Sequence, residues 1–475
     1  METIALRDNR LSRKEFIGGG LAAMLSAGCV CPSAAARPRW YKGMLHAHTY
    51  WSDGRCLPDV AVAAYRDAGY DFITLSDHNR FGTDPDRWMP VDPDFGGWPA
   101  KAVEPAQFER YRRDFPNGDW RVRNGRTEVR IRTWKELCAA YGRPGRFLLL
   151  PGVEITSYTG RADEDYLNLH MNYVGLEGVI ERATGKELNE FVGGTDVAGL
   201  IRDNLTQVRR LAATQGNPPH VVMVNHPHSR YFDVRPADIL ANPEVGFFEV
   251  CNNGSDQAPV AELANDGWEN DRFWDAVLAG RCNRGERLLY ALASDDTHYY
   301  PNSGTAYAPI NFADGYIRVR ARDLSAAALF EAMARGDFYA SCGVDLDDVS
   351  FADGRLSVRV PAKTGVRFTV RFIVTRCGVP CDPVGTVKVR ATGEEMPFER
   401  EVPVYDPRVG ETAAIVSGRI GEPLSASYEL RQDDLYVRAR IESDEPSPFP
   451  RPSRMHPRVK CAWTQPYGLR GLKIS

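Results

Sequence analysis

Residues 42–79 read KGMLHAHTYWSDGRCLPDVAVAAYRDAGYDFITLSDHN, and this stretch decides the fold class. A short apolar run at 42–45 is followed by an alanine-rich segment at 58–68 and a second apolar run at 72–75. Pro58 suits the first turn of a helix, and Gly69 suits the position just after its end. The stretch therefore predicts a strand, a helix and a strand in succession, the unit from which parallel sheets are built.

The same alternation continues to about residue 340. Further strands are expected at residues 147–150, 221–224, 247–250 and 288–293, and further helices at residues 133–141, 200–211, 272–279 and 324–334. This α/β pattern favours a parallel sheet, either open or closed into a barrel. From residue 344 the pattern changes to β-type stretches at residues 355–360, 366–374, 385–390 and 435–441. We therefore expect an α/β domain at 37–343 and a smaller all-β, sandwich-like domain at 344–475.

Composition is ordinary for a globular protein and argues against several functional classes. The 475 residues are 43% hydrophobic and 26% charged, and their net charge is -4. This balance argues against a basic nucleic-acid-binding surface. No apolar run approaches the roughly 20 residues that span a bilayer. The sequence lacks a Gly-rich phosphate loop, a dinucleotide fingerprint and a Gly-x-Ser-x-Gly elbow, which disfavours kinases, dehydrogenases and serine hydrolases.

Residues 1–36 have the pattern of an export signal. Four basic residues between Arg7 and Lys14 precede an apolar stretch at 16–27, and small residues follow at 33–36. SRKEFI at 12–17 resembles a twin-arginine signal with one lysine, and LSAGC at 25–29 resembles a lipobox that would place a lipid anchor on Cys29. A short N-terminal core helix is the alternative, although three successive glycines disfavour it. We expect an exported protein that is periplasmic or associated with the cell envelope.

Residues 80–146 interrupt the strand and helix alternation as an insertion. They are rich in tryptophan and proline, and ten arginines lie between Arg110 and Arg146. Two interpretations remain open: a solvated surface excursion, or a lid whose guanidinium groups bind an anionic substrate. The lid interpretation assigns Arg110, Arg112 and Arg113 to substrate binding, because loops at the carboxyl ends of barrel strands shape substrate access.

Only nine histidines occur in the chain, and most lie beside carboxylates near the predicted strands. In chain order these groups are His46, His48 and Asp53, then Asp77 and His78, then Glu154, His170, then His226 and His228, and finally Asp296 and His298. The carboxyl ends of parallel strands converge at one edge, so residues that follow different strands can meet there. Imidazole and carboxylate ligands together suit zinc, manganese or iron better than calcium. The pattern predicts a metal centre.

The order of these motifs resembles the PHP (polymerase and histidinol phosphatase) superfamily of metal-dependent phosphoesterases. The matching motifs are HAHTYWSDG at 46–54, TLSDHN at 74–79, PGVEI at 151–155, NHP at 225–227 and DDTH at 295–298. The resemblance implies a distorted (β/α)7 barrel that holds two to three divalent metal ions through nine ligands. Carried over residue by residue, the ligands are His46, His48, Asp53, His78, Glu154, His170, His226, Asp296 and His298.

The resemblance also implies how the ligands divide among the ions. His46, His48, Glu154 and Asp296 would hold one ion, Glu154, His170 and His226 a second, and Asp53, His78 and His298 a third. Such ions would generate a bridging hydroxide and stabilise the charge that develops on an ester, so His46, His48, Glu154 and Asp296 would act in catalysis through them. Asp77 and Asn225 are expected to orient neighbouring histidines. His228 is either a substrate contact or proton donor, or a plain surface histidine.

The export signal, the β-rich tail and AWTQP at 462–466 resemble one branch of the superfamily, the exported carbaryl-hydrolase-like enzymes. We expect a hydrolase for a small, anionic ester, most simply a phosphoesterase, with carbamate or carboxylic ester hydrolysis as the alternative. Amidohydrolases also begin with His-x-His but normally lack the second and last motifs. The alternative of another class is a non-catalytic cell-envelope binding module with a structural metal, although nine ligands exceed the four that one structural ion uses.

Overall fold

The computed structural model describes residues 37–95, 100–158, 168–180, 196–227, 234–252, 270–301, 312–391, 398–447 and 459–468. The predicted export signal with Cys29 lies outside these residues, and so does His228. Within the described ranges, no helix combines the length and the hydrophobicity that a membrane crossing needs.

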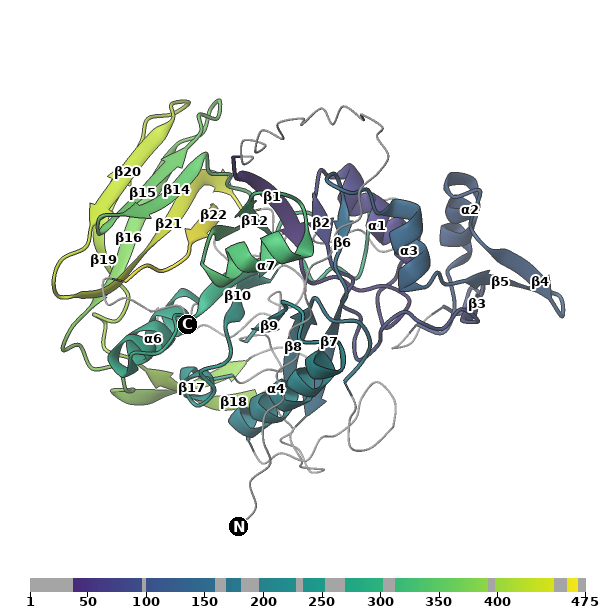
Figure 1. The fold of residues 1–475 in the computed structure, drawn as a ribbon, viewed down its shortest axis with the longest axis horizontal. Coiled ribbons are helices and arrows are strands. Elements are labelled where there is room, and N and C mark those ends of the chain that lie inside the picture. The colour runs from purple at the N-terminus through teal and green to yellow at the C-terminus, as the bar shows by residue number, and fades with distance from the viewer. Residues whose placement is uncertain are drawn as a thin grey trace, which may run out of the picture. The chain divides into compact units, whose positions relative to one another are not determined.

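If the consecutive β6 and β7 are counted as one strand, strand pairing and two isolated bridges connect seven strands in a ring. Figure 1 labels these strands except β11. The ring contains β1 (Arg39–Met44), β2 (Phe72–Ile73), β6 (Leu148–Leu149), β7 (Gly152–Tyr158), β8 (Asn168–Val174), β9 (Val221–Val224), β10 (Phe247–Asn252) and β11 (Tyr290–Ser294). A single parallel bridge between Ala47 and Thr297 joins the chain beyond β1 to the chain beyond β11. A second bridge joins His78 to Glu154. These connections close the ring, which is consistent with a distorted barrel.

The ring departs from an all-parallel arrangement at β8. This strand is antiparallel to both of its neighbours, β7 and β9. Residues 159–167 are all that separates β7 from β8, whereas a parallel crossover needs a dozen or more residues. The short connection therefore accounts for the reversed direction of β8, a strand that the sequence pattern did not predict.

Helices accompany the ring much as the alternation predicted. They are α1 (Pro58–Asp67), α3 (Trp134–Tyr141), α4 (Val197–Thr214), the short α5 (Pro236–Leu240), α6 (Asn270–Arg284) and α7 (Ala326–Ala334). Pro58 occupies the first turn of α1, as expected, and Tyr65 in the same helix is fully buried. One large apolar core joins these helices to the ring strands, with Val153 and Phe248 among its members. The strand ends are therefore held by a rigid scaffold.

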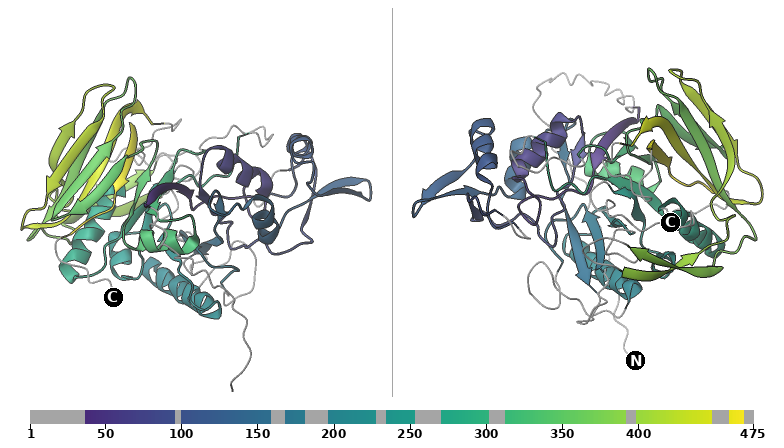
Figure 2. Two further views of the ribbon diagram at one scale, coloured as in Figure 1. Left: turned by 45° about the horizontal axis from the view of Figure 1, so that its top comes forward. Right: turned by 180° about the vertical axis from the view of Figure 1, so that it is seen from behind.

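The C-terminal region is a sandwich of two sheets (Figure 2). One layer contains β14 (Asp348–Ala352), β15 (Arg355–Val360) and β20 (Leu424–Glu429). The other contains β16 (Phe368–Arg376), β19 (Glu411–Ser417) and β21 (Asp434–Pro446), and Val358 and Ile441 belong to the apolar core between the layers. β17 (Gly385–Ala391) and β18 (Phe398–Val404) form a separate hairpin.

The second layer of the sandwich continues into the ring. From β21 the sheet passes through β22 (Val459–Thr464), β13 (Phe338–Ser341) and β12 (Tyr316–Ala321) to β1. Residues 38–475 form one compact unit. Hydrogen bonds of a single sheet therefore connect strands from both sides of residue 343. That the two domains fold independently stays a prediction.

The insertion is a folded element with its own apolar core. It contains β3 (Trp88–Pro90), α2 (Pro105–Asp114), β4 (Trp120–Arg123) and β5 (Arg126–Arg130). Its core includes Phe108 and Val129, together with Tyr50 and Trp51 from the loop after β1. Arg112 and Arg113 are exposed and pair with Glu109 and Asp114 on the same helix. An arginine lid over the substrate therefore stays a prediction, whereas the packing against the loop after β1 is observed.

Candidate metal centre

All nine predicted ligands lie together at one edge of the ring. His46, His48, Asp53, His78, His226, Asp296 and His298 follow the ends of β1, β2, β9 and β11, as expected. Glu154 and His170 instead lie within β7 and β8. Glu154 was expected to follow the strand that ends near Leu150, and this was wrong because a further strand, β7, begins at Gly152 and contains it.

The ligands form four overlapping groups in which the candidate ligand atoms lie within 4.8 Å of one another. One group has four members, His48, Asp53, His78 and His298, and the others are His46, Glu154 and His226, then His46, His48 and Asp296, then His78, Glu154 and His170. Asp53, His78 and His298 were expected to share an ion, and the structure adds His48 to them. Each group has the two or more nitrogen donors and one carboxylate that suit a borderline divalent ion.

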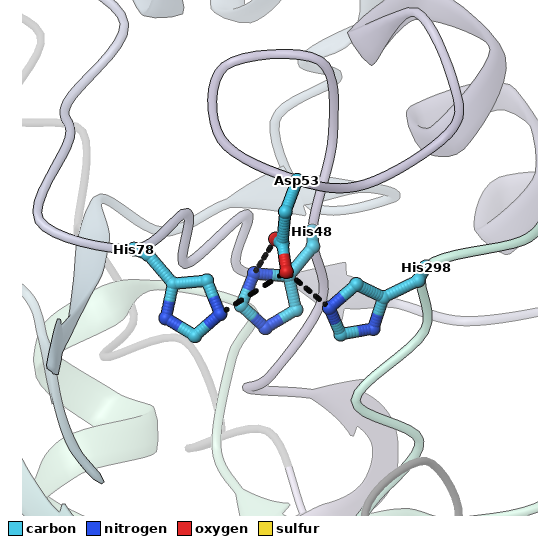
Figure 3. A group of neighbouring side chains, drawn as sticks. All are labelled: His48, Asp53, His78 and His298. Carbon is cyan, nitrogen blue, oxygen red and sulfur yellow. Dashed lines mark hydrogen bonds and ion pairs between the residues drawn. The ribbon is translucent and has the colours of Figure 1, made fainter. Parts of the chain in front are cut away.

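Figure 3 shows the group of four, in which the Asp53 carboxylate faces three imidazole rings. Its Oδ2 lies 3.1 Å from Nε2 of His298 and 3.5 Å from Nε2 of His78. Its Oδ1 lies 3.5 Å from Nδ1 of His48. Asp53 is the only carboxylate of this group, so it supplies the group's negative charge.

Glu154 occupies the middle of the centre. Its Oε1 lies 3.1 Å from His46 and from His170, and 3.4 Å from His226. Its Oε2 lies 2.9 Å from His78 and 3.2 Å from Nε2 of His48. A carboxylate that faces imidazoles on both oxygens is placed to bridge two ions.

Several of these donor atoms are buried without a hydrogen bond of good geometry. They include Nε2 of His46, both ring nitrogens of His48 and Oε2 of Glu154. A buried polar atom without any partner costs about 1–3 kcal/mol, and the ion pairs described above offset part of that cost. Divalent cations would satisfy these atoms, so the residues present fit the metal ions that the sequence resemblance implies.

The charges of the centre are strongly coupled. Burial raises the pKa of Asp53, but the neighbouring His298 and His78 outweigh burial and hold the pKa well below its usual range. Burial lowers the pKa of His46, yet Asp296, Glu154 and Glu249 hold it well above its usual value. In the absence of cations, the carboxylates therefore favour protons on His46, His78 and His298, whose pKa values are raised. At His170 burial outweighs Glu154 and lowers the pKa to about 4. Metal ions would displace these protons and take over their role.

Glu249 is a candidate site residue that the sequence analysis missed. It is fully buried on β10, and Oε1 lies 2.7 Å from Nδ1 of His46. Oε2 accepts a hydrogen bond from the backbone N–H of His226 at 2.7 Å and one from Asn252 at 2.8 Å. Ser294 donates to Oε1. Because Nδ1 of His46 is bound in this way, Nε2 is directed to the ligand groups.

Asp77 and Asn225 support ligands other than the neighbouring histidines that we expected. Asp77 accepts hydrogen bonds from the backbone N–H groups and the hydroxyls of Thr49 and Ser52, at 2.7–3.1 Å. It thereby organises the loop that carries Asp53. Asn225 donates to Oε1 of Glu154 at 2.7 Å. Neighbours in sequence did not identify these partners, because each side chain reaches across the edge of the ring.

Two ligands lie on unusual backbone. His226 has a φ of 23° and Asp296 has a φ of 50°. Positive φ is uncommon for residues with a side chain and is often found where a site requires a particular side-chain direction. Asp295, next to Asp296, is also buried but accepts hydrogen bonds from the backbone of Ala313, Asp314 and Gly315. This arrangement supports Asp296 rather than Asp295 as the ligand.

Comparisons with known proteins give similar solved structures. A two-domain protein from Bacteroides vulgatus that contains a predicted PHP-like metal-dependent phosphoesterase is 14% identical, with 91% of this chain and 95% of that chain covered and a TM-score of 0.36. A candidate metal-dependent phosphoesterase from Bifidobacterium adolescentis is 14% identical over 57% of this chain and 92% of that one, with a TM-score of 0.28. An amidohydrolase from Chromobacterium violaceum is 15% identical over 54% and 87%, with a TM-score of 0.23.

No family model matches the sequence, and no curated protein matches it. The functional assignment therefore depends on the ligands and geometry of the site itself.

Proposed function

We propose that this protein is a metal-dependent hydrolase of the PHP superfamily that binds two or three divalent ions, which we expect to be zinc, manganese or iron. The observation that carries the proposal is the convergence of nine imidazole and carboxylate ligands, from separate strands of the ring, into four groups with ligand atoms within 4.8 Å. One structural ion would use four of these ligands. The remainder supports a centre with more than one ion.

Accessibility of the ligands favours catalysis over a structural role. The side chains of His298 and His170 are 27% and 12% exposed, whereas those of His46, His48 and Glu154 are fully buried. Solvent therefore reaches the centre at His298 and His170, while His46, His48 and Glu154 are enclosed. A structural site usually has no such opening, while a catalytic site needs one for its substrate.

The charge of the loaded centre supports an anionic substrate. Two or three divalent ions would carry four or six positive charges, against three negative charges from the carboxylate ligands Asp53, Glu154 and Asp296. The buried carboxylates of Glu249 and Asp77 lie nearby and reduce this excess. Bound ions of this kind acidify water and withdraw charge from the oxygens of an ester. Glu154 would hold neighbouring ions at a fixed separation, Asn225 would fix its orientation, and Glu249 would fix that of His46. We therefore propose a small phosphate ester as the substrate.

Two measurements test the proposal. The protein is loaded with zinc, manganese or iron, its metal content is measured, and turnover is assayed on chromogenic phosphate esters, aryl esters and aryl carbamates. We expect two to three ions per chain, loss of turnover on chelation, and a preference for the phosphate esters. Turnover of only the aryl esters or carbamates would contradict the phosphoesterase proposal, and a single tightly held ion without turnover would favour a binding module.

The variant Glu154→Gln provides the site-specific test. Glu154 belongs to two of the ligand groups, so its carboxylate would screen two cations from each other. The amide variant should therefore bind less metal and lose turnover. Glu128→Gln, on the insertion, is a matched control because Glu128 pairs with Arg121 away from the centre. Full metal content and wild-type turnover in Glu154→Gln would contradict the assignment of the site.

A further inference from the structure

Asp53 lies on a loop whose path is tightly fixed. The loop leaves β1 at His46 and passes through residues 49–55 before α1 begins. At Gly54 it approaches the backbone of His48 so closely that an added Cβ would lie 2.4 Å from the His48 carbonyl carbon. Beyond it, the backbone N–H of Arg55 donates to the carbonyl of His298 at 2.7 Å. Asp53 therefore reaches its ligand position only if this loop keeps its shape.

The inner side of the loop is held by the barrel. Asp77 accepts hydrogen bonds from Thr49 and Ser52, as described above. These bonds fix the beginning of the loop. They leave the backbone carbonyls of Tyr50 and Arg55, on either side of Asp53, to be fixed by other groups.

The outer side of the loop is held by the insertion. The Tyr50 hydroxyl donates to Oε1 of Gln107 at 2.7 Å, and Nε2 of Gln107 donates to the Arg55 carbonyl at 2.9 Å. Gln107 lies on α2, is only 3% exposed, and thus ties together two points of the loop that flank Asp53. Arg87 donates to the Tyr50 carbonyl at 3.1 Å.

Apolar packing reinforces these bonds. Trp51 is buried, and its indole N–H donates to the Arg132 carbonyl at 3.1 Å. Gly82 lies against the same indole, where an added Cβ would come within 2.8 Å of the ring. Tyr50 and Trp51 belong to the core that also contains Phe108 and Val129 of the insertion. The loop is thus part of the core of the insertion.

We propose that residues 80–146 act as a clamp that fixes Asp53 for metal binding, and that Gln107 is the positioning residue of this clamp. The inference rests on the proposed function, because it concerns one of the ion positions. Without Asp53, the group of four retains only the imidazoles of His48, His78 and His298. The clamp therefore controls whether this group carries a negative charge and holds its cation.

The test compares metal binding in Tyr50→Phe, Gln107→Leu and the double variant with that of the wild type. Each protein is titrated with zinc against a competing chelator, and circular dichroism and thermal unfolding of the metal-free protein monitor the fold. Asp53→Asn serves as the reference for loss of the ligand. Glu109→Gln is the matched control on α2, because the Glu109 side chain is 61% exposed and pairs with the exposed Arg112.

We expect the Tyr50 and Gln107 variants to bind one ion roughly tenfold more weakly, while the other ions bind as in the wild type. The double variant should lose no more affinity than Gln107→Leu alone, because both substitutions remove the same hydrogen bond. Selective loss of one ion, the same ion that Asp53→Asn loses, distinguishes positioning from general destabilisation. If Gln107→Leu does not fold, Tyr50→Phe, which removes only a hydroxyl, decides the question.

Two results would overturn the clamp. Folded variants that bind every ion with wild-type affinity would overturn the clamp but not the proposed function. Variants in which the affinity for every ion falls equally would do the same. A wild-type protein that binds no divalent ion would instead overturn the proposed function, and the clamp with it.

Discussion

At the scale of single residues, buried carboxylates hold the candidate ligands of the centre in position. Glu249 lies between Phe248 and Val250 on β10, and all three are buried. An ionised carboxylate at such a position is costly unless its oxygens are bonded. His46, Asn252, Ser294 and the backbone of His226 supply those bonds, so one side chain fixes two ligands from different strands.

Replacing Glu249 therefore tests how the ligands are oriented. Glu249→Ala leaves Nδ1 of His46 and the backbone N–H of His226 without their acceptor. We expect metal affinity to fall about 10–100-fold, measured by zinc titration against a chelator. Glu244→Gln, at an exposed position before the same strand, is the control and should bind metal like the wild type. Equal affinities in the two variants would contradict the role of Glu249.

The nine ligands could be predicted from sequence because their motifs are short and each lies near a strand end. Glu249 could not, because a single acidic residue in an apolar run lacks a pattern of its own. The sequence still offered one indication: a carboxylate in an apolar strand is costly to bury unless hydrogen-bond donors surround it. Gln107 was equally hidden, since its partners Tyr50 and Arg55 are more than fifty residues away.

At the scale of elements, α3 shows how the insertion is joined to the barrel. Thr133 and Glu136 form a capping box at its N-terminus. Arg130, at the end of β5, donates to both carboxylate oxygens of Glu136 at 2.7 and 3.1 Å. The hydrogen bond from Arg130, with those from Thr133, lowers the pKa of Glu136 to about 2 despite partial burial.

Glu136→Gln should reveal this interaction through its pH dependence. Glutamine can keep the capping-box acceptor but loses the ion pair with Arg130, whose partner Glu136 is partly exposed. At pH 7 we therefore expect the free energy of unfolding to fall by about 1 kcal/mol or less. The folded-state pKa of Glu136, about 2, lies below its unfolded value of about 4.3, so the stabilisation is present above that unfolded pKa and is lost as the pH falls towards 2. Chemical denaturation at pH 7, 4 and 3 measures the difference. A difference that stays constant over this range would contradict the assignment.

The elements that sequence patterns predicted are those with regular spacing. The alanine-rich α1 and the alternating β15 match their expected ranges closely. The direction of β8 could not be predicted from its own residues, because it depends on the length of one connection. The core of the insertion was missed because three of its ten described buried members, Tyr50, Trp51 and Leu57, come from the loop after β1. Contacts between residues that are distant in sequence do not produce a periodic pattern of apolar residues, so a sequence pattern cannot predict them.

At the scale of the whole molecule, a buried ion pair connects the barrel to the sandwich. Arg438 on β21 donates to both oxygens of Asp275 on α6, at 2.7 and 2.8 Å, and lies 2.7 Å from Asp271. The Arg438 and Asp275 side chains are 0% and 1% exposed. At Gly410 the sandwich backbone also comes close to Asp275, where an added Cβ would lie 2.1 Å from its Oδ2.

Asp275→Ala should therefore destabilise the whole unit. Removing one partner of a buried ion pair costs about 3–5 kcal/mol when the other charge is left without a partner. Asp271 still pairs with Arg438 in this variant, so we expect a loss of about 3 kcal/mol, at the lower end of that range. Arg355→Gln is the control within the sandwich, since the Arg355 and Glu429 side chains are 55% and 70% exposed and such pairs contribute about 1 kcal/mol or less. Urea denaturation compares the two variants. Similar losses in both would contradict a joint unit.

Export stays a prediction that depends on residues 1–36. We expect the protein in the periplasmic or envelope fraction, and Cys29→Ser should release it from the envelope if Cys29 carries a lipid. Fractionation with an antibody to the folded unit measures this. Recovery of the full-length protein in the cytoplasm, with its N-terminus intact, would contradict the export signal.

β22 has a consequence for the order of events during synthesis. Ser341, at the end of β13, and its partner Cys461 are 120 residues apart, and the Gln465 side chain pairs with the backbone of Ala291 on β11 as a neighbouring strand would. A ribosome releases β11 and β13 long before these partners exist. Until β22 is synthesised, the edge of β13 that pairs with it has no partner strand. An unpaired strand edge is prone to association with other chains. The compact state of the barrel is therefore reached late in translation, and chains halted before residue 459 should remain sensitive to protease.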